Sequence, residues 1–202
     1  MIEINRFTLR TLFWLPIAFA AWYFLSVLWV VPIAGAIDFL MPPLLPKMLD
    51  GITADGNILI VSTHLALTPA DGKTQISEGL LFELHVLKYA YSIPLYTSLV
   101  VASLCRDTVS ASRWALGMVA LFFTVVFGVA TDLLKTLAID LQPITRPTGN
   151  FPHWAESPLA LLYQLGYLIL PPVTPIMLWF VQFPEYWSSF FRTPDSGGSD
   201  IA

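Results

Sequence analysis

Charged residues are scarce in this sequence. Only 12% of its 202 residues are Asp, Glu, Lys or Arg, against about a quarter in ordinary soluble proteins. Ten Lys and Arg stand beside 14 Asp and Glu, so the formal net charge is −4. No basic stripe is available to follow a phosphate backbone. The composition excludes a typical soluble domain and argues against nucleic acid as a partner.

Cysteine is almost absent as well. Cys105 is the only thiol, which excludes an internal disulfide framework and a site built from several thiolates. A catalytic cysteine needs a base within reach, and we expect all three histidines at the opposite end of the membrane span that carries Cys105. Cys105 is therefore interpreted as structural. The sequence also has no phosphate-cradling glycine loop and no HExxH or GxSxG motif, and we expect no cofactor.

Apolar and aromatic residues are abundant instead. Hydrophobic residues make up 56% of the chain and aromatic residues 14%, and there are 16 prolines. These proportions are typical of membrane proteins with kinked helices and aromatic residues at the bilayer boundaries. Four apolar stretches predict four transmembrane helices, at residues 12–33, 89–105, 114–134 and 159–183.

The two outermost spans carry additional signals. Ala34-Gly35-Ala36 resembles a signal-peptide cleavage site, but the apolar run before it is longer than the about 7–15 residues of a signal sequence. We interpret it as a retained anchor. In the last span Pro171, Pro172 and Pro175 predict a kinked or partly unwound second half.

The composition changes between the first two predicted spans. Residues 38–49 hold three prolines within five positions and predict a short interfacial helix rather than a regular span. Residues 50–57 are rich in turn formers. Two aliphatic stretches, 58–67 and 79–87, flank the sequence Ala-Asp-Gly-Lys at 70–73 and predict a β-hairpin. Its unpaired edges could accept an extended peptide as an added strand.

These segments predict a mainly α membrane protein: a four-helix bundle with a small extracytoplasmic hairpin domain between its first two helices. The expected parts are residues 1–34 (first span), 35–88 (extracytoplasmic segment), 89–183 (remaining spans) and 184–202 (disordered cytoplasmic tail). Arginines flank the first span and the short loop after the second, namely Arg6, Arg10, Arg106 and Arg113. The positive-inside rule then places both termini in the cytoplasm. In a bacterium the hairpin would lie in the periplasm.

His64, Glu83 and His85 on the hairpin are ligand types that zinc uses. A hairpin that turns near residues 71–72 places His64 opposite residues 79–81 and His85 opposite residues 58–60. At about 3.3 Å per residue the two histidines would lie more than about 10 Å apart. We therefore expect no metal there.

Ionisable residues at the outer ends of the spans form a candidate binding cluster. Asp132 and Lys135 stand three residues apart on one helix and are predicted to pair. Ionisable groups at membrane depth are costly and are candidates for function. The cluster is either an ion-pair network that locks helices together or a polar pocket for a peptide or lipid headgroup, since no nucleophile lies in this layer. Its candidate members are Glu83, Lys88, Tyr89, Tyr91, Asp132, Lys135, Gln164 and Tyr167.

Four sequence strings carry a family resemblance. They are Phe82-Glu83-Leu84, the stretch LKYAYSIPL at 87–95, TDLLK at 131–135 and YQLGY at 163–167. They resemble the exosortase H-associated membrane proteins, which are small multi-pass bacterial proteins encoded beside a sortase-like membrane protease. The resemblance implies an inner-membrane accessory protein without catalytic activity. Its implied partners are membrane lipid, the exosortase and the C-terminal sorting signals of substrates.

The layout also looks like a reduced exosortase, whose catalytic set is a Cys, an Arg and a His. The Cys would fall near residues 88–90, where none occurs, and the Arg near Lys135, which cannot provide bidentate hydrogen bonds. The His would fall at His153 or at Gln164. The resemblance therefore implies a scaffold without its nucleophile. Two alternatives stay open: a membrane enzyme that uses Lys88, Asp132, Lys135 or His153, and a lipid-binding or transport subunit.

Overall fold

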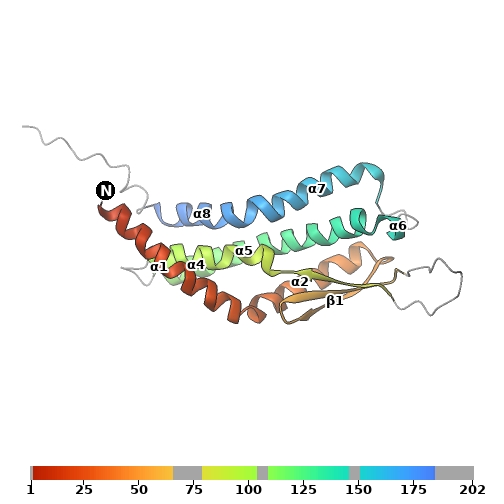
Figure 1. Ribbon diagram of the computed structural model, residues 1–202, viewed down its shortest axis with the longest axis horizontal. Coiled ribbons are helices and arrows are strands. Elements are labelled where there is room, and N and C mark those ends of the chain that lie inside the picture. Colours follow the sequence, from red (N-terminus) through yellow and green to blue (C-terminus); the bar gives the residue numbers. More distant parts are fainter. Residues whose placement is uncertain (1, 66–78, 104–108, 146–150, 185–202) are drawn as a thin grey trace, which may run out of the picture.

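A computed structural model describes residues 2–65, 79–103, 109–145 and 151–184. The protein is mainly helical and has one small sheet (Figure 1). Within these residues, four helical stretches are long and apolar enough to cross a membrane: Asn5–Phe24, Val27–Leu44, Ala111–Asp140 and His153–Gln182. The expected number of candidate spans is thus found. The second member of the set, however, differs from the expected one.

The N-terminal apolar run forms two helices rather than one span. α1 (Ile2–Phe24) and α2 (Val27–Leu44) are separated by a turn at Leu25 and Ser26. The Ser26 hydroxyl donates a hydrogen bond to the Asn57 side chain, which ties this turn to the sheet. Residues 38–44 continue α2, so the separate helix expected at 38–49 is wrong. Pro42 and Pro43 lie in the last turn of α2, where neither can donate to the carbonyl four residues earlier, and the helix ends directly after them at Leu44.

The sheet has three antiparallel strands in the order β1-β2-β3. They are β1 (Leu49–Asp55), β2 (Ile58–Thr63) and β3 (Leu81–His85). The predicted pairing of β2 with β3 is confirmed, and Ile58 lies opposite His85 as expected. The loop predicted around residues 70–73 lies outside the described residues.

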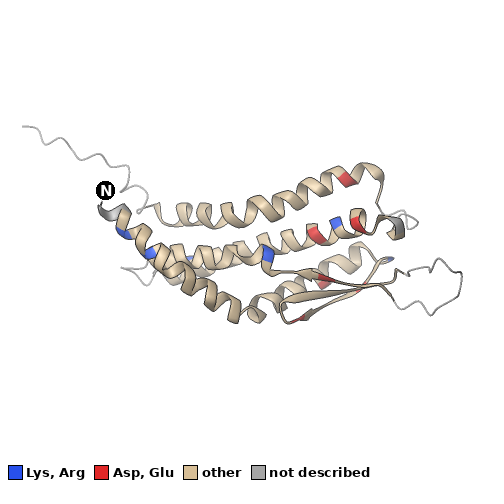
Figure 2. Ribbon diagram, viewed as in Figure 1, with Lys and Arg blue, Asp and Glu red and all other residues tan. Residues whose placement is uncertain are grey.

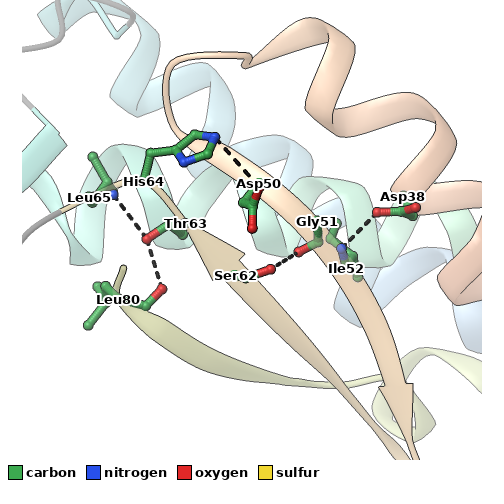
Figure 3. Close-up of polar contacts among 9 residues, drawn as sticks. All are labelled: Asp38, Asp50, Gly51, Ile52, Ser62, Thr63, His64, Leu65 and Leu80. Atoms are coloured by element: carbon green, nitrogen blue, oxygen red, sulfur yellow. Dashed lines mark hydrogen bonds and ion pairs between the residues drawn. The ribbon is translucent and has the colours of Figure 1, made fainter. Parts of the chain in front are cut away.

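Strand β1 corrects the expected turn at residues 50–57. The turn comprises only Gly56 and Asn57, and Gly56 supplies the positive φ of 58° that a tight hairpin turn requires. A register irregularity interrupts β1 between Leu49 and Gly51. There the Ile52 amide donates a 2.7 Å hydrogen bond to Asp38 on α2 (Figure 3). β1 is therefore held from two sides, by β2 and by α2.

One face of the sheet packs on the helices. Ile52, Leu59, Val61 and Leu84 are buried and join the main hydrophobic core. β1 packs against α2, and β3 contacts α5 (Val109–Lys135). Side chains alternate along each strand, so the remaining ones point to the other face. On that face Thr53, Asp55, Leu81, Glu83 and His85 are exposed.

Strand β3 leads through Val86 into two consecutive short helices, where the sequence predicted a single span. These are α3 (Leu87–Ala90) and α4 (Ser92–Ser103). α4 packs against α1 and α8 (Leu170–Gln182). It has only 12 residues and is shorter than the predicted span at 89–105, whose end at Cys105 lies outside the described residues. α2 takes its place among the candidate spans.

The third predicted span is longer than expected. α5 continues through the π-helical turn η1 (Thr136–Asp140), and α6 (Gln142–Thr145) follows. The segment between the third and fourth predicted spans is thus partly helical. α5 already begins at Val109, within the loop expected up to Arg113.

The last predicted span is helical throughout. The short helix η3 (His153–Ala155), α7 (Glu156–Gln164), the π-helical turn η4 (Leu165–Ile169) and α8 follow one another directly. The prolines do not unwind this span: Pro171 and Pro172 occupy the first turn of α8, where no intrahelical amide donor is needed, and the helix continues past Pro175 to Gln182. The irregular turn lies one step earlier, at η4. Except for Pro184, the tail predicted to be disordered lies outside the described residues.

Two tyrosines pack against two glycines on α5. The Tyr96 ring lies where a side chain at Gly117 would be, and the Tyr89 ring lies against Gly128. Tyr96 also donates hydrogen bonds to the Arg113 carbonyl, at 3.1 Å, and to the Gln182 side chain. These contacts hold α3, α4 and α8 against α5.

Candidate functional site

A buried ion pair joins the β3–α3 junction to α5. The Lys88 ammonium nitrogen lies 2.8 Å from Asp132 Oδ2. The Asp132 side chain is only 6% exposed, whereas the Lys88 side chain is 34% exposed. Because β3 runs into α3 without a loop, Lys88 is placed by the sheet and Asp132 by the bundle. The pair therefore fixes the sheet relative to α5.

Lys135 pairs with Asp140 rather than with Asp132. The Lys135 ammonium nitrogen lies 2.6 Å from Asp140 Oδ2, so the predicted pairing of Asp132 with Lys135 is wrong. In a regular α-helix, residues five apart point about 140° away from each other. The wider π-helical turn η1 rotates Asp140 back toward Lys135. Such π-turns often occur at functional sites.

Tyrosines surround the two lysines. The Tyr163 ring on α7 stacks on the Tyr167 ring at a centroid distance of 5.8 Å, and Tyr167 meets the buried Tyr89 ring edge-on at 6.0 Å. The ammonium groups of Lys88 and Lys135 lie 6.0 Å and 5.5 Å from the Tyr163 ring centroid. At these distances a cation is attracted to an aromatic face.

Tyr163 is thus the central residue that the sequence did not single out. It is also the contact that links Lys88 to Lys135. A signal was present, because Tyr163 and Tyr167 are four residues apart and therefore share one helix face. We call Lys88, Tyr89, Asp132, Lys135, Tyr163 and Tyr167 the lysine–tyrosine cluster.

Three predicted members lie at its margin or outside it. Glu83 is exposed on the open face of β3, and the Gln164 side chain is exposed on α7. Tyr91 is half-buried, and its hydroxyl lies within electrostatic range of Tyr167. Glu83 and Gln164 are therefore surface residues near the cluster, whereas Tyr91 extends it.

The histidines lie apart from the lysine–tyrosine cluster. His64 is 3.8 Å from Asp50 at one end of the sheet (Figure 3), and His85 is at the opposite end of β3. His153 lines a shallow depression with Gln142 and Glu156, whose side chains are joined by a 2.6 Å hydrogen bond. Over the described residues, no group of three His, Cys, Asp or Glu side chains could hold a metal ion.

Four apolar helices of spanning length are typical of a multi-span membrane protein, and Asp132 on one of them pairs with Lys88 on α3. A family model described as exosortase H-associated membrane protein matches residues 1–186, and the chain belongs to this family. The resemblance found in the sequence is thereby confirmed. No curated protein and no solved structure matches the chain.

Proposed function

We propose that the protein is a non-catalytic accessory subunit of an exosortase H-type sorting system in the bacterial inner membrane. Its family membership carries this proposal. Its binding surface for the sortase or its substrates would be the extracytoplasmic end of the molecule. This end contains the sheet and the lysine–tyrosine cluster.

The chemistry of the cluster supports a scaffold rather than an enzyme. Lys88 and Lys135 each hold an aspartate within 2.8 Å, and the cluster contains neither cysteine nor serine. Residues 88–90, where a related protease would carry its nucleophile, are Lys-Tyr-Ala, and Tyr89 and Ala90 are buried. His153 lines a separate depression. These groups are arranged to stabilise helices and to present a polar rim.

The exposed members of the cluster are the proposed contact points. Tyr167 is 36% exposed, and about a third of each lysine side chain is accessible. Tyrosine is enriched at the centres of protein interfaces and among the residues that contribute most to binding, whereas lysine is more frequent at their rims. A partner that covers them would bury Tyr167 and extend the contacts of Tyr163.

The test is co-purification of the tagged protein with the sortase from a strain that also reports processing of a sorting-signal substrate. Tyr167→Ala removes an exposed contact without breaking an ion pair, and Lys88→Ala removes the buried pair. We expect both variants to reduce co-purification and processing. The level of the Tyr167→Ala protein should be maintained, whereas Lys88→Ala leaves the buried Asp132 unpaired and is therefore compared per amount of folded protein in the membrane. Lys47→Ala is the matched control, because Lys47 is exposed and lies outside the cluster.

Two results would overturn the proposal. Normal co-purification and processing in both cluster variants would show that the lysine–tyrosine cluster is not the binding surface. Cleavage of a sorting-signal peptide by the purified protein alone, without the sortase, would show that the subunit is an enzyme.

A further inference from the structure

The two edges of the sheet differ in their surroundings. β1 packs against α2, and Asp38 on α2 accepts a hydrogen bond from the Ile52 amide of β1 (Figure 3). On the other side β3 is the last strand. Among the described residues, no hydrogen bond joins residues 81–85 to any group outside β2. An edge strand of this kind is a template for another strand.

The register shows which amides of β3 are available. The Thr63 amide donates to the Leu80 carbonyl at 3.1 Å. Because paired and unpaired positions alternate along an antiparallel strand, the backbone groups of Phe82 and Leu84 face β2. Those of Leu81, Glu83 and His85 face the free edge.

The side chains of the edge alternate in the same way. Leu81, Glu83 and His85 are exposed on the open face of the sheet, whereas Leu84 is buried toward the bundle. Five residues of strand offer about 17 Å of edge. This length fits a short extended segment, and Glu83 stands at its middle.

Charge indicates what kind of segment fits. In the described parts of residues 38–88 and 132–156 there are seven Asp and Glu but only three lysines. Figure 2 shows acidic residues distributed along the sheet half of the molecule. Two of the lysines are paired inside the lysine–tyrosine cluster. A cation opposite Glu83 would form a favourable cross-strand pair.

Pairing with a second copy of the chain is disfavoured by the same residue. Two β3 strands joined antiparallel about their midpoints would place Glu83 opposite Glu83. Like charges directly opposite each other destabilise a sheet. The edge is thus poorly suited to self-association but remains open to a basic strand.

We propose that β3 receives an extended, lysine- or arginine-containing segment of a partner polypeptide as a fourth strand. This inference rests on the proposed function, since it names the kind of chain that the accessory subunit would hold. The backbone of Leu81, Glu83 and His85 supplies the hydrogen bonds, and the Glu83 carboxylate selects a basic residue.

The test measures binding of a fluorescent seven-residue peptide of alternating lysine and valine to the full-length protein in a non-ionic detergent. A peptide with glutamate in place of lysine is compared. We expect the basic peptide to bind more tightly. Glu83→Lys should reverse this preference. It should weaken binding of the basic peptide by about fivefold and strengthen binding of the acidic peptide by about fivefold. Glu83→Pro, which removes the outward amide but no bond to β2, should weaken both peptides by about tenfold.

Asp55→Lys is the matched control. It changes the net charge equally and lies on the same open face, but on β1. Its peptide preference should equal that of the parent protein. An equal effect of Asp55→Lys and Glu83→Lys would overturn the inference, because binding would then depend on overall charge alone.

Two further outcomes are decisive. Undiminished peptide binding by folded Glu83→Pro would show that the peptide binds away from β3. If Glu83→Pro does not fold, the peptide preference of Glu83→Lys decides: an unchanged preference for the basic peptide would overturn the inference. If the peptide does not bind along β3 but the sortase still co-purifies with Glu83→Lys, the proposed function stands and only the inference about the edge is overturned. Loss of co-purification in the Tyr167 and Lys88 variants with peptide binding intact would assign sortase and peptide to separate surfaces.

Discussion

Lys88 and Asp132 are unequal partners. The Asp132 side chain is 6% exposed, so it has given up nearly all its hydration, whereas Lys88 keeps about a third of its side chain accessible. A lysine near the surface can extend its ammonium group toward water when its partner is lost. A buried carboxylate cannot do so. The stability of the pair therefore depends more on keeping Lys88 than on keeping Asp132.

We predict that Lys88→Met destabilises the protein more than Asp132→Asn. The first change leaves a buried carboxylate unpaired, at a cost of about 3–5 kcal/mol. The second leaves a neutral amide that can still accept a hydrogen bond from Lys88, at a cost of about 1–2 kcal/mol. Thermal unfolding in detergent, followed by the loss of monodisperse protein, measures both.

A double variant provides the control for this prediction. Lys88→Met combined with Asp132→Leu replaces both charges by apolar groups and should recover most of the stability lost in Lys88→Met alone. An equal loss in the two single variants would contradict the asymmetry of burial.

The members of the lysine–tyrosine cluster were predictable by residue type but not by partner. Lysines and aspartates inside apolar segments are conspicuous in a sequence, and Lys88, Asp132 and Lys135 were singled out for that reason. Helical spacing suggested that Asp132 pairs with Lys135. The π-helical turn η1 makes Asp140 the partner instead, and no local pattern indicates that turn. Tyr163 was missed because its role depends on two lysines from other elements.

At the scale of elements, the predictions succeeded where a segment's own pattern decides its structure. The turn position near residues 71–72 predicted the register of β2 and β3 correctly, with His85 opposite Ile58. Asp50, Gly51 and Gly56 are turn formers and predict a turn at 50–57. Residues 49–55 form β1 instead, because they pair with β2 and are held by α2 through the bond of Ile52 to Asp38. The break between α1 and α2 has no proline or glycine at Leu25 and Ser26. It is fixed by the distant Asn57.

The elements around the cluster approach each other closely at Gly128 on α5. A Cβ atom there would lie 2.6 Å from Tyr89 Cδ1 and 3.3 Å from the Gly166 carbonyl oxygen. Only a residue without a side chain allows α3 and η4 to approach α5 at this point. Gly166 faces Gly128 from η4, with its own Cβ position 3.1 Å from the Gly128 Cα.

We predict that Gly128→Ala separates these elements and lowers the free energy of unfolding by about 1–3 kcal/mol, as expected for an overpacked core. Gly35→Ala is the matched control, because Gly35 also lies in a helix but has no atom within 4 Å of its Cβ position. It should be neutral or stabilising by up to about 1 kcal/mol. Equal effects of the two substitutions in the same unfolding assay would show that α5 is not tightly packed at Gly128.

At the scale of the whole molecule, the two ends differ in charge. Arg6 and Arg10 on α1 and Arg113 near the start of α5 lie toward the N-terminal end, and the sheet end carries most of the acidic residues (Figure 2). α1 and α2 lead from the N-terminal end to the sheet end, α4 returns, α5 leads back, and α7 and α8 return (Figure 1). This path brings the start of α1 and the end of α8 to the same end of the molecule, although α2 rather than α4 has spanning length.

We predict from this asymmetry that the sheet is extracytoplasmic and the N-terminus cytoplasmic, because positively charged span ends are retained inside. Cys105→Ser gives a background without thiols, since Cys105 is the only cysteine. Single cysteines are then introduced at Thr53 on β1 and at Asn5 on α1, which are both exposed. A membrane-impermeant maleimide should label Thr53→Cys in intact spheroplasts, and Asn5→Cys only after lysis. The opposite labelling pattern would reverse the orientation and place the lysine–tyrosine cluster and the β3 edge out of reach of extracytoplasmic partners.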